Sequence, residues 1–203
     1  MKDAETQIRG ELFTHRLLWE CCNELAETAH KARGSGADPF YFELSSMLMA
    51  FLTYESYINF LGDRLGPEIW KREKEYFNKN PYKGLEGKLK KVHEMCDISN
   101  IQKHKRPYQT IKDLSSLRTY LSHGKPDKYE KVVKHERGKD PGMFYAKINQ
   151  MVSEKHLNAA IHDVEEFIEF LHKKARRVGD EVSLDEKALE GVLQESMSDT
   201  RSI

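Results

Sequence analysis

Apolar residues recur at helical spacing through most of the 203-residue chain. Residues 4–33 contain no proline and carry apolar side chains three or four positions apart, which predicts a first helix that ends at Gly34. Asp38 followed by Pro39 is typical of a helix start. The apolar run that follows, residues 40–61, is too long for a strand. We therefore expect the second helix to be the most buried one.

Further helices are predicted where an apolar stripe lies between a residue that favours a helix start and one that favours a helix end. The sequence therefore predicts an all-α fold, an up-and-down helical bundle of four to five main helices. The remaining predicted helices are a short one at 68–77, one at 85–97, one from Pro107 to Gly124, and a last one from 154 to about 178 that Ser153 caps.

Two segments depart from this pattern. Residues 125–150 have strand-like content on both sides of a turn at 138–142, which predicts a small β-hairpin. In the acidic tail, residues 184–197 have a thin apolar face that a helix could use. We expect two parts: a helical bundle at 1–178 and a partly helical or flexible tail at 179–203.

The composition is that of a folded chain, with 38% apolar and 33% charged residues and nine each of Phe and Tyr. No stretch approaches the roughly 18 apolar residues that a membrane helix needs, and the first residues form no apolar signal core. Two of the three cysteines are adjacent, Cys21 and Cys22, which does not suit a disulfide framework. We expect reduced thiols, a cytoplasmic location and no membrane partner.

The net charge of zero conceals a division along the chain. Residues 71–139 hold 19 basic and 9 acidic side chains, whereas the segments before and after them each carry a net charge of −5. A basic centre can attract a polyanion such as RNA, although lysine-rich loops are often only solvated. The candidate RNA-binding residues flank the helix predicted from Pro107 to Gly124; they are Lys103, Lys105, Arg106 and Lys125.

Several familiar sites are missing from the sequence: a Gly-rich phosphate loop, paired CxxC motifs, HExxH, and the Gly-x-Ser-x-Gly elbow. His93 and Cys96 have the spacing of half a zinc site, but the sequence offers no other half. We therefore expect no metal site and no other cofactor. The remaining candidate is an arginine and a histidine at the end of a predicted helix, Arg118 and His123.

The helical wheel places two charged residues among apolar ones. Arg118 lies about 40° from Leu114 in its helix, and Glu55 lies about 20° from Leu44 in the second helix. Burial of either charge alone is costly, so we expect Glu55 to face Arg118 or to share a polar cleft with it. An ion pair that only fixes the register of the two helices fits the same pattern.

His123 lies about 180° from Leu114 on the same wheel, which directs it away from the core. The dipole at the last turn of a helix favours the cationic form of a histidine. Together with Thr119, four positions earlier, His123 therefore suits proton transfer or phosphate binding. The structural alternative is a histidine that only caps the helix.

Two segments resemble the HEPN family: Leu117 to Gly124 resembles its signature helix end, and Tyr54 to Asn59 resembles its earlier helix. The resemblance implies a bundle that dimerises so that two Arg/His motifs face one another across a composite cleft. Many HEPN proteins are metal-independent endoribonucleases. On that reading His123 is a general acid or base, Arg118 stabilises charge on phosphorus, and Thr119 and Glu55 support them.

The resemblance has an alternative functional implication. HEPN proteins commonly have Asn, Asp or His directly after the arginine, where this chain has Thr119. Members without ribonuclease activity serve as dimeric binding modules or as partners of nucleotidyltransferase-like proteins. The second expectation is thus a non-catalytic homodimeric module of a defence or toxin–antitoxin system, with a protein partner such as an antitoxin.

Overall fold

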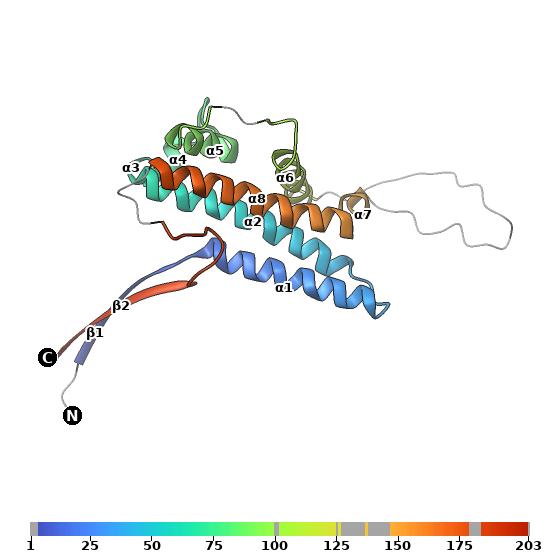
Figure 1. Ribbon diagram of the computed structural model, residues 1–203, viewed down its shortest axis with the longest axis horizontal. Helices are drawn as coiled ribbons and strands as arrows, with labels where there is room; N and C mark the ends of the chain where they lie inside the picture. The colour runs from blue at the N-terminus through green and yellow to red at the C-terminus, as the bar shows by residue number, and fades with distance from the viewer. Residues whose placement is uncertain are drawn as a thin grey trace.

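Three long helices form the centre of the molecule and lie side by side with their axes in roughly the same direction (Figure 1). In this computed structural model, residues 4–99, 102–124, 126, 137, 147–178 and 184–202 are described. The long helices are α1 (Thr14–Gly34), α2 (Phe40–Leu65) and α8 (Glu154–Val178).

Two shorter helices pack on α2 on the side away from α1 (Figure 1). They are α5 (Gly84–Met95) and α6 (Tyr108–Ser122), and α6 also packs on α8. The predicted all-α bundle is therefore confirmed. Single turns of helix lie in the connections: α3 (Pro67–Trp70), α4 (Glu73–Tyr76) and α7 (Lys147–Met151).

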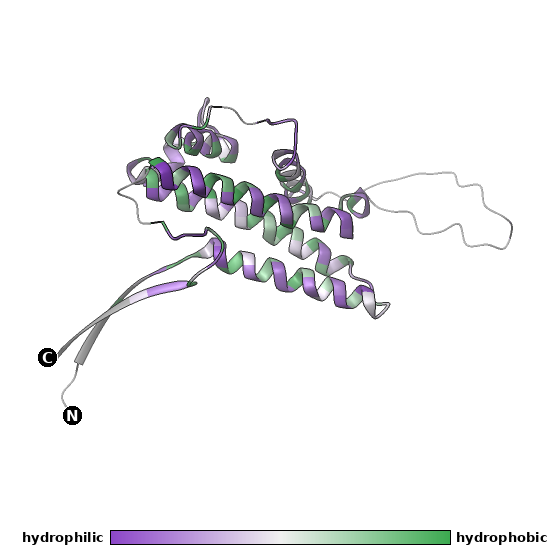
Figure 2. Cartoon of the chain, in the orientation of Figure 1, coloured by the Kyte–Doolittle hydropathy of each residue, from purple (hydrophilic) through white to green (hydrophobic). Residues whose placement is uncertain are grey.

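The core lies between α2 and the helices around it. Polar and apolar residues alternate along each long helix (Figure 2), so that each helix turns an apolar stripe inward. Two predicted helix starts are confirmed by their hydrogen bonds: Asp38 Oδ1 accepts from Phe40 N–H at 3.0 Å, and Ser153 Oγ accepts from His156 N–H at 3.3 Å. The fully buried core side chains include Tyr57, Ile58, Leu61, Leu114, Leu117, Leu157, Val164, Ile168 and Leu171.

The predicted helix at residues 4–33 is wrong over its first third. Residues Ala4–Leu12 form strand β1, which pairs antiparallel with β2 (Gln194–Ser202), and α1 begins only at Thr14. Charged or amide residues occupy every odd position from 5 to 11, which is the two-residue period of a strand. At Gly10 a Cβ atom would lie 2.6 Å from the carbonyl oxygen of Glu195, so glycine permits the close pairing.

The helix that the sequence allowed at 184–197 is not formed, because the structure has no helix there and β2 begins at Gln194. Residues 184–193, which we call the C-terminal strap, run without regular structure across the bundle, bury Ala188 and Leu189, and lead into β2. The segment therefore buries apolar side chains against the bundle without forming a helix. Most of the predicted hairpin at 125–150 lies outside the described residues, and its last part is helical, within α7.

None of the described helices combines the length and the apolar character that a bilayer-crossing segment requires.

Candidate functional site

The end of α6 carries the Arg/His motif. Pro107 precedes the helix, and the His123 N–H closes it by donating to the carbonyl oxygen of Thr119 at 3.1 Å. The buried side chains of α6 end at Leu117, so the final turn holds no fully buried residue. Three of the predicted site residues are consequently exposed in this turn or directly after it: Arg118, Thr119 and His123.

The predicted burial of Arg118 is wrong, whereas the predicted exposure of His123 is confirmed. The wheel assumed that neighbouring helices cover α6 along its whole length, but burial stops one residue before Arg118. Glu55 is half-buried on α2. The structure places no ion pair or hydrogen bond between Glu55 and Arg118, so the expected pairing of the two charges is not formed.

Arg118 and His123 are both exposed at the end of α6. Within the part of the chain that the structure describes, no side chain lies at hydrogen-bond or ion-pair distance from either of them. They are five positions apart, which corresponds to about 140° around a helix. The two side chains of one copy therefore leave α6 in different directions.

The predicted RNA-binding loop lies at the other end of α6. A helix of 15 residues is about 22 Å long, and Lys103 and Lys105 precede it whereas His123 follows it. Lys103 Nζ lies 3.7 Å from a carboxylate oxygen of Glu86, and both lysines are exposed. This loop and the Arg/His motif of the same copy do not form one compact site. Lys125 lies outside the described residues.

Arg106 has a structural partner in Asp163, on α8. Its Nε and Nη2 atoms donate to the two carboxylate oxygens at 2.6 and 2.8 Å, and the Thr110 hydroxyl donates to the same carboxylate. Burial acts to raise the pKa of Asp163, but the hydrogen bonds from Arg106, Thr110 and His162 outweigh it and hold that pKa below its usual value. Arg106 thus fixes the loop before α6 to α8.

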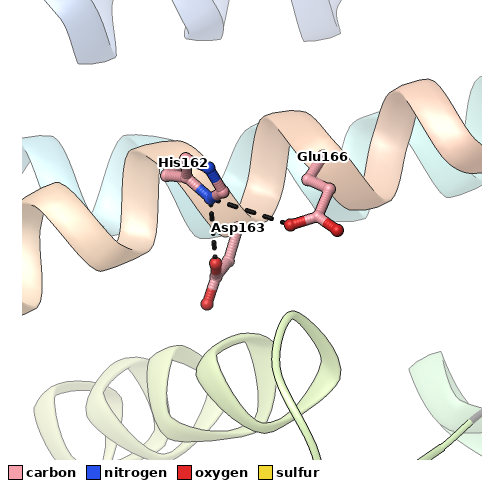
Figure 3. A group of neighbouring side chains, drawn as sticks. All are labelled: His162, Asp163 and Glu166. Atoms are coloured by element: carbon pink, nitrogen blue, oxygen red, sulfur yellow. Dashed lines mark hydrogen bonds and ion pairs between the residues drawn. The ribbon is translucent and has the colours of Figure 1, made fainter.

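Figure 3 shows the group of described residues whose ligand atoms lie close enough together to hold a metal ion: His162, Asp163 and Glu166. His162 Nδ1 lies 3.2 Å from Asp163 and 3.7 Å from Glu166. Asp163 points toward α6 (Figure 3), where its oxygens already accept from Arg106 and Thr110. The guanidinium charge opposes a cation there, so we interpret the group as an ion-pair network.

His93 and Cys96, the half zinc site of the sequence, are both packed into the protein. Burial lowers the pKa of His93 to about 4 and raises that of Cys96 to about 11. At neutral pH the imidazole is therefore neutral and the thiol keeps its proton. Within the described residues no second pair of metal ligands lies beside them.

A buried polar cluster around Arg16 was not predicted by the sequence. Arg16 is 3% exposed and donates to two strap carbonyl oxygens, that of Ala188 at 3.3 Å and that of Val192 at 2.9 Å. It also pairs with the carboxylate of Asp185. Because Arg16 lies near the start of α1, this cluster joins the two ends of the described chain.

His172 extends the Arg16 cluster into the core. Its Nε2 lies 2.9 Å from the carbonyl oxygen of Asp185, which can only accept, so Nε2 carries a proton. In the neutral ring Nδ1 is then an acceptor, and the Tyr57 hydroxyl donates to it at 2.7 Å. Each of these buried polar groups therefore has a partner, which is the condition for a stabilising buried network.

We expect Arg16→Met to destabilise the fold by about 2 to 4 kcal/mol, because the buried strap carbonyls lose their donor while the methionine retains the apolar stem. This corresponds to a fall in Tm of about 4 to 16 °C for a chain of this size. Thermal melting followed by circular dichroism measures it. The control is Lys31→Met, an exposed residue of the same helix; equal melting of the two variants would contradict the anchoring role.

Two buried histidines predict acid destabilisation. Burial lowers the pKa of both His15 and His93 to about 4, from an ordinary value of 6.5. As the pH falls, these two histidines take up protons in the unfolded chain before they do so in the folded one. Their contribution to the free energy of unfolding is therefore fully present above about pH 6.5 and is lost as the pH falls toward 4. Between pH 7 and 5 the loss is about 1 to 2 kcal/mol per histidine. Urea unfolding at both pH values should show a smaller loss in His15→Asn, and an unchanged one in His156→Asn.

The structure gathers Arg118, Thr119 and His123 at one exposed helix end and brings neither Glu55 nor the Lys103 loop to them. Comparison of the chain with protein-family models, curated proteins and solved structures finds no significant match. We therefore infer function from the residues of this site and from the residues around it.

Proposed function

We propose that the protein is a homodimeric RNA-binding protein of the HEPN type that cleaves RNA without a metal ion, with Arg118 and His123 as the active pair. The observation that carries the proposal is the availability of both side chains. Four described arginines bind carboxylates, whereas Arg118 is exposed and has no such partner among the described residues. Those four are Arg16, Arg33, Arg64 and Arg106.

The divergence of the two side chains supports a composite site. Because Arg118 and His123 leave α6 about 140° apart, one copy does not direct both at a single phosphate. A twofold axis beside the end of α6 brings Arg118 of one copy next to His123 of the other, and a twofold contact is the commonest way in which identical chains associate. Each dimer then has two equivalent sites.

The chemistry that this pair supports is attack of a ribose 2′-hydroxyl on the adjacent phosphorus. His123 takes the proton of the hydroxyl, the 2′-oxygen bonds to phosphorus, and the bond from phosphorus to the 5′-oxygen breaks. The departing oxygen takes up a proton from water. Arg118 stabilises the charge that develops on the phosphoryl oxygens, and the Thr119 hydroxyl donates to one of them. The products are a 2′,3′-cyclic phosphate and a 5′-hydroxyl.

Glu55 has no part in this chemistry as we propose it, because it is half-buried on α2 and does not contact Arg118. The basic loop before α6 extends the surface available to a longer RNA. Lys103 and Lys105 are exposed there, about one helix length from His123. Contacts of this kind with phosphates strengthen binding without reading the sequence.

A non-catalytic dimeric module is the second candidate function. The β1–β2 pair favours it, because this pair extends away from the bundle (Figure 1) and offers open strand edges to a protein partner. Thr119 also favours it, since a threonine side chain reaches less far than the larger polar residues common at this place in HEPN ribonucleases. An antitoxin or another component of a defence system is a partner of the expected kind.

Cleavage of RNA in the presence of a chelator tests the first candidate. The purified chain is incubated with mixed single-stranded RNA and EDTA, and in parallel with DNA of the same sequences. We expect RNA fragments with cyclic phosphate ends and intact DNA, because DNA lacks the attacking hydroxyl. Intact RNA at micromolar protein, or fragments that form only without EDTA, would contradict the proposal and favour the binding module.

A further inference from the structure

The β-ribbon, by which we mean β1 paired with β2, projects from the start of α1 away from the helices (Figure 1). Among the described residues its sheet has two strands, each of nine residues, so each strand has one edge whose backbone groups lack a strand partner. A two-stranded ribbon alone is marginally stable in water, and an open edge is a template for another strand. The ribbon would therefore be stabilised by an added strand.

The two faces of the ribbon differ in charge. Alternate positions of a strand share a face, and the register pairs uncharged residues on one of them. Ile8 on this face is 70% exposed and Leu12 is 52% exposed, although both are large and apolar. The uncharged pairs next to the bundle are Leu12–Gln194, Gly10–Ser196 and Ile8–Ser198, whereas Glu11–Glu195 and Glu5–Arg201 belong to the charged set.

One acidic residue of β2 has no counter-charge among the side chains that the structure describes. The register places Glu195 directly opposite Glu11, and like charges at such positions repel one another. Arg64 neutralises Glu11, with 2.5 Å between Nη2 and the carboxylate. Glu195 is exposed and has no ion-pair partner among the side chains that the structure describes. A cation beside the open edge of β2 would correct this imbalance.

The sequence of β2 supplies that cation when it pairs with itself. Antiparallel pairing of two β2 strands about their central residue, Ser198, matches all nine positions and puts Glu195 opposite Arg201 of the second copy, twice. A shift of the symmetry centre by one residue, to 197, puts Glu195 opposite Asp199. The same centred pairing of two β1 strands sets Glu5 against Glu11. Among the self-pairings that match all nine positions of a strand, charge therefore favours the edge of β2 over that of β1.

We propose that a second copy of this chain docks on the free edge of β2, so that the two ribbons form a four-stranded antiparallel sheet in the order β1, β2, β2, β1. The twofold axis is perpendicular to this sheet, so the uncharged faces of the two ribbons lie on the same side. Ile8 and Leu12 of both copies then lie on one side of the sheet, on its two outer strands, with the Ser198 residues of the two copies between the Ile8 pair.

This contact is separate from the Arg/His motif. The ribbon leaves the bundle at the start of α1, whereas α6 packs on α2 and α8 on the side away from α1 (Figure 1). The ribbon contact therefore does not rest on the proposed ribonuclease activity. A chain that uses both surfaces would assemble beyond the dimer.

Charge reversal tests the ribbon contact, with mass measured by sedimentation or light scattering across a range of concentrations. We expect Glu195→Arg and Arg201→Glu each to weaken the self-association of the wild type about tenfold or more, leaving at most the dimer proposed at α6, because two attractive pairs become repulsive. An equimolar mixture of the two variants should dimerise again, since each supplies the charge that the other needs. Glu20→Arg, the same change on exposed α1, should behave as the wild type.

Two results would overturn the ribbon contact. One is a wild type that stays monomeric at every concentration, which would leave the β2 edge to a different protein. The other is self-association of both single variants to the same mass and with the same strength as the wild type, which would place every contact between copies elsewhere, for example at α6. Cleavage assays separate the proposals: RNA cleavage by Glu195→Arg at the wild-type rate, together with loss of the ribbon dimer, supports two independent surfaces.

Discussion

Replacing His123 with alanine is expected to slow RNA cleavage about 100-fold or more, because a positioned general base contributes that much to proton transfer. The side chain is exposed and has no partner in the described structure, so its removal should leave Tm unchanged. Single-turnover cleavage of an end-labelled RNA measures the effect. His30→Ala is the control, since His30 is also exposed but lies on α1.

Mixing two inactive variants tests whether the site is shared between copies. Arg118→Ala should also lose cleavage, because the developing phosphoryl charge is no longer stabilised. If each site uses Arg118 of one copy and His123 of the other, an equimolar mixture of the two variants contains mixed dimers with one intact site. The mixture should then regain about one quarter of the wild-type rate, by random pairing of twofold dimers. No recovery would contradict the composite site, and equal cleavage by His123→Ala and wild type would exclude His123 as the base.

Gly87→Ala in α5 is expected to destabilise the fold by about 3 kcal/mol. Gly87 is buried in the first turn of this helix, and a Cβ atom there would lie 1.8 Å from the carbonyl oxygen of Tyr82 and 1.9 Å from its carbonyl carbon. Both atoms are backbone, so the clash cannot be relieved by rotating a side chain. Urea unfolding measures the change in the free energy of unfolding.

Gly34→Ala provides the matched control for Gly87→Ala. Gly34 ends α1, and a Cβ atom there would have nothing within 4 Å. Alanine is the better helix former, so this variant should be as stable as the wild type or more stable, by up to about 1 kcal/mol. Destabilisation of both variants to the same extent would show that the packing of α5 on the Tyr82 backbone is not the cause.

The helices were predictable where a capping residue and an apolar stripe indicate the same segment. Ser153 gave the start of α8, and the apolar stripe behind it gave the whole helix to Val178, because capping and burial act within a few residues. The ribbon was not predictable in this way. Residues of β1 pair with residues about 180 to 200 positions later, and three apolar residues at four-residue spacing, Ala4, Ile8 and Leu12, fit a helix as well as a strand.

The candidate site was predictable only in part, for a related reason. A wheel shows the direction of a side chain but not how far the neighbouring helix extends, so His123 was placed correctly and Arg118 was not. The cluster at Arg16 gave no signal in the sequence. Its burial depends on carbonyl groups of the C-terminal strap, which nothing near Arg16 in the chain indicates.

The pairing of β1 with β2 also sets an order of events during synthesis. A ribosome makes about 180 residues between the end of β1 and the start of β2, which takes roughly 10 to 40 s at ordinary elongation rates. Throughout that interval Ile8 and Leu12 of β1 have no β2 strand to pair with. Neighbouring nascent chains on one messenger can therefore exchange strands before either chain closes its own ribbon.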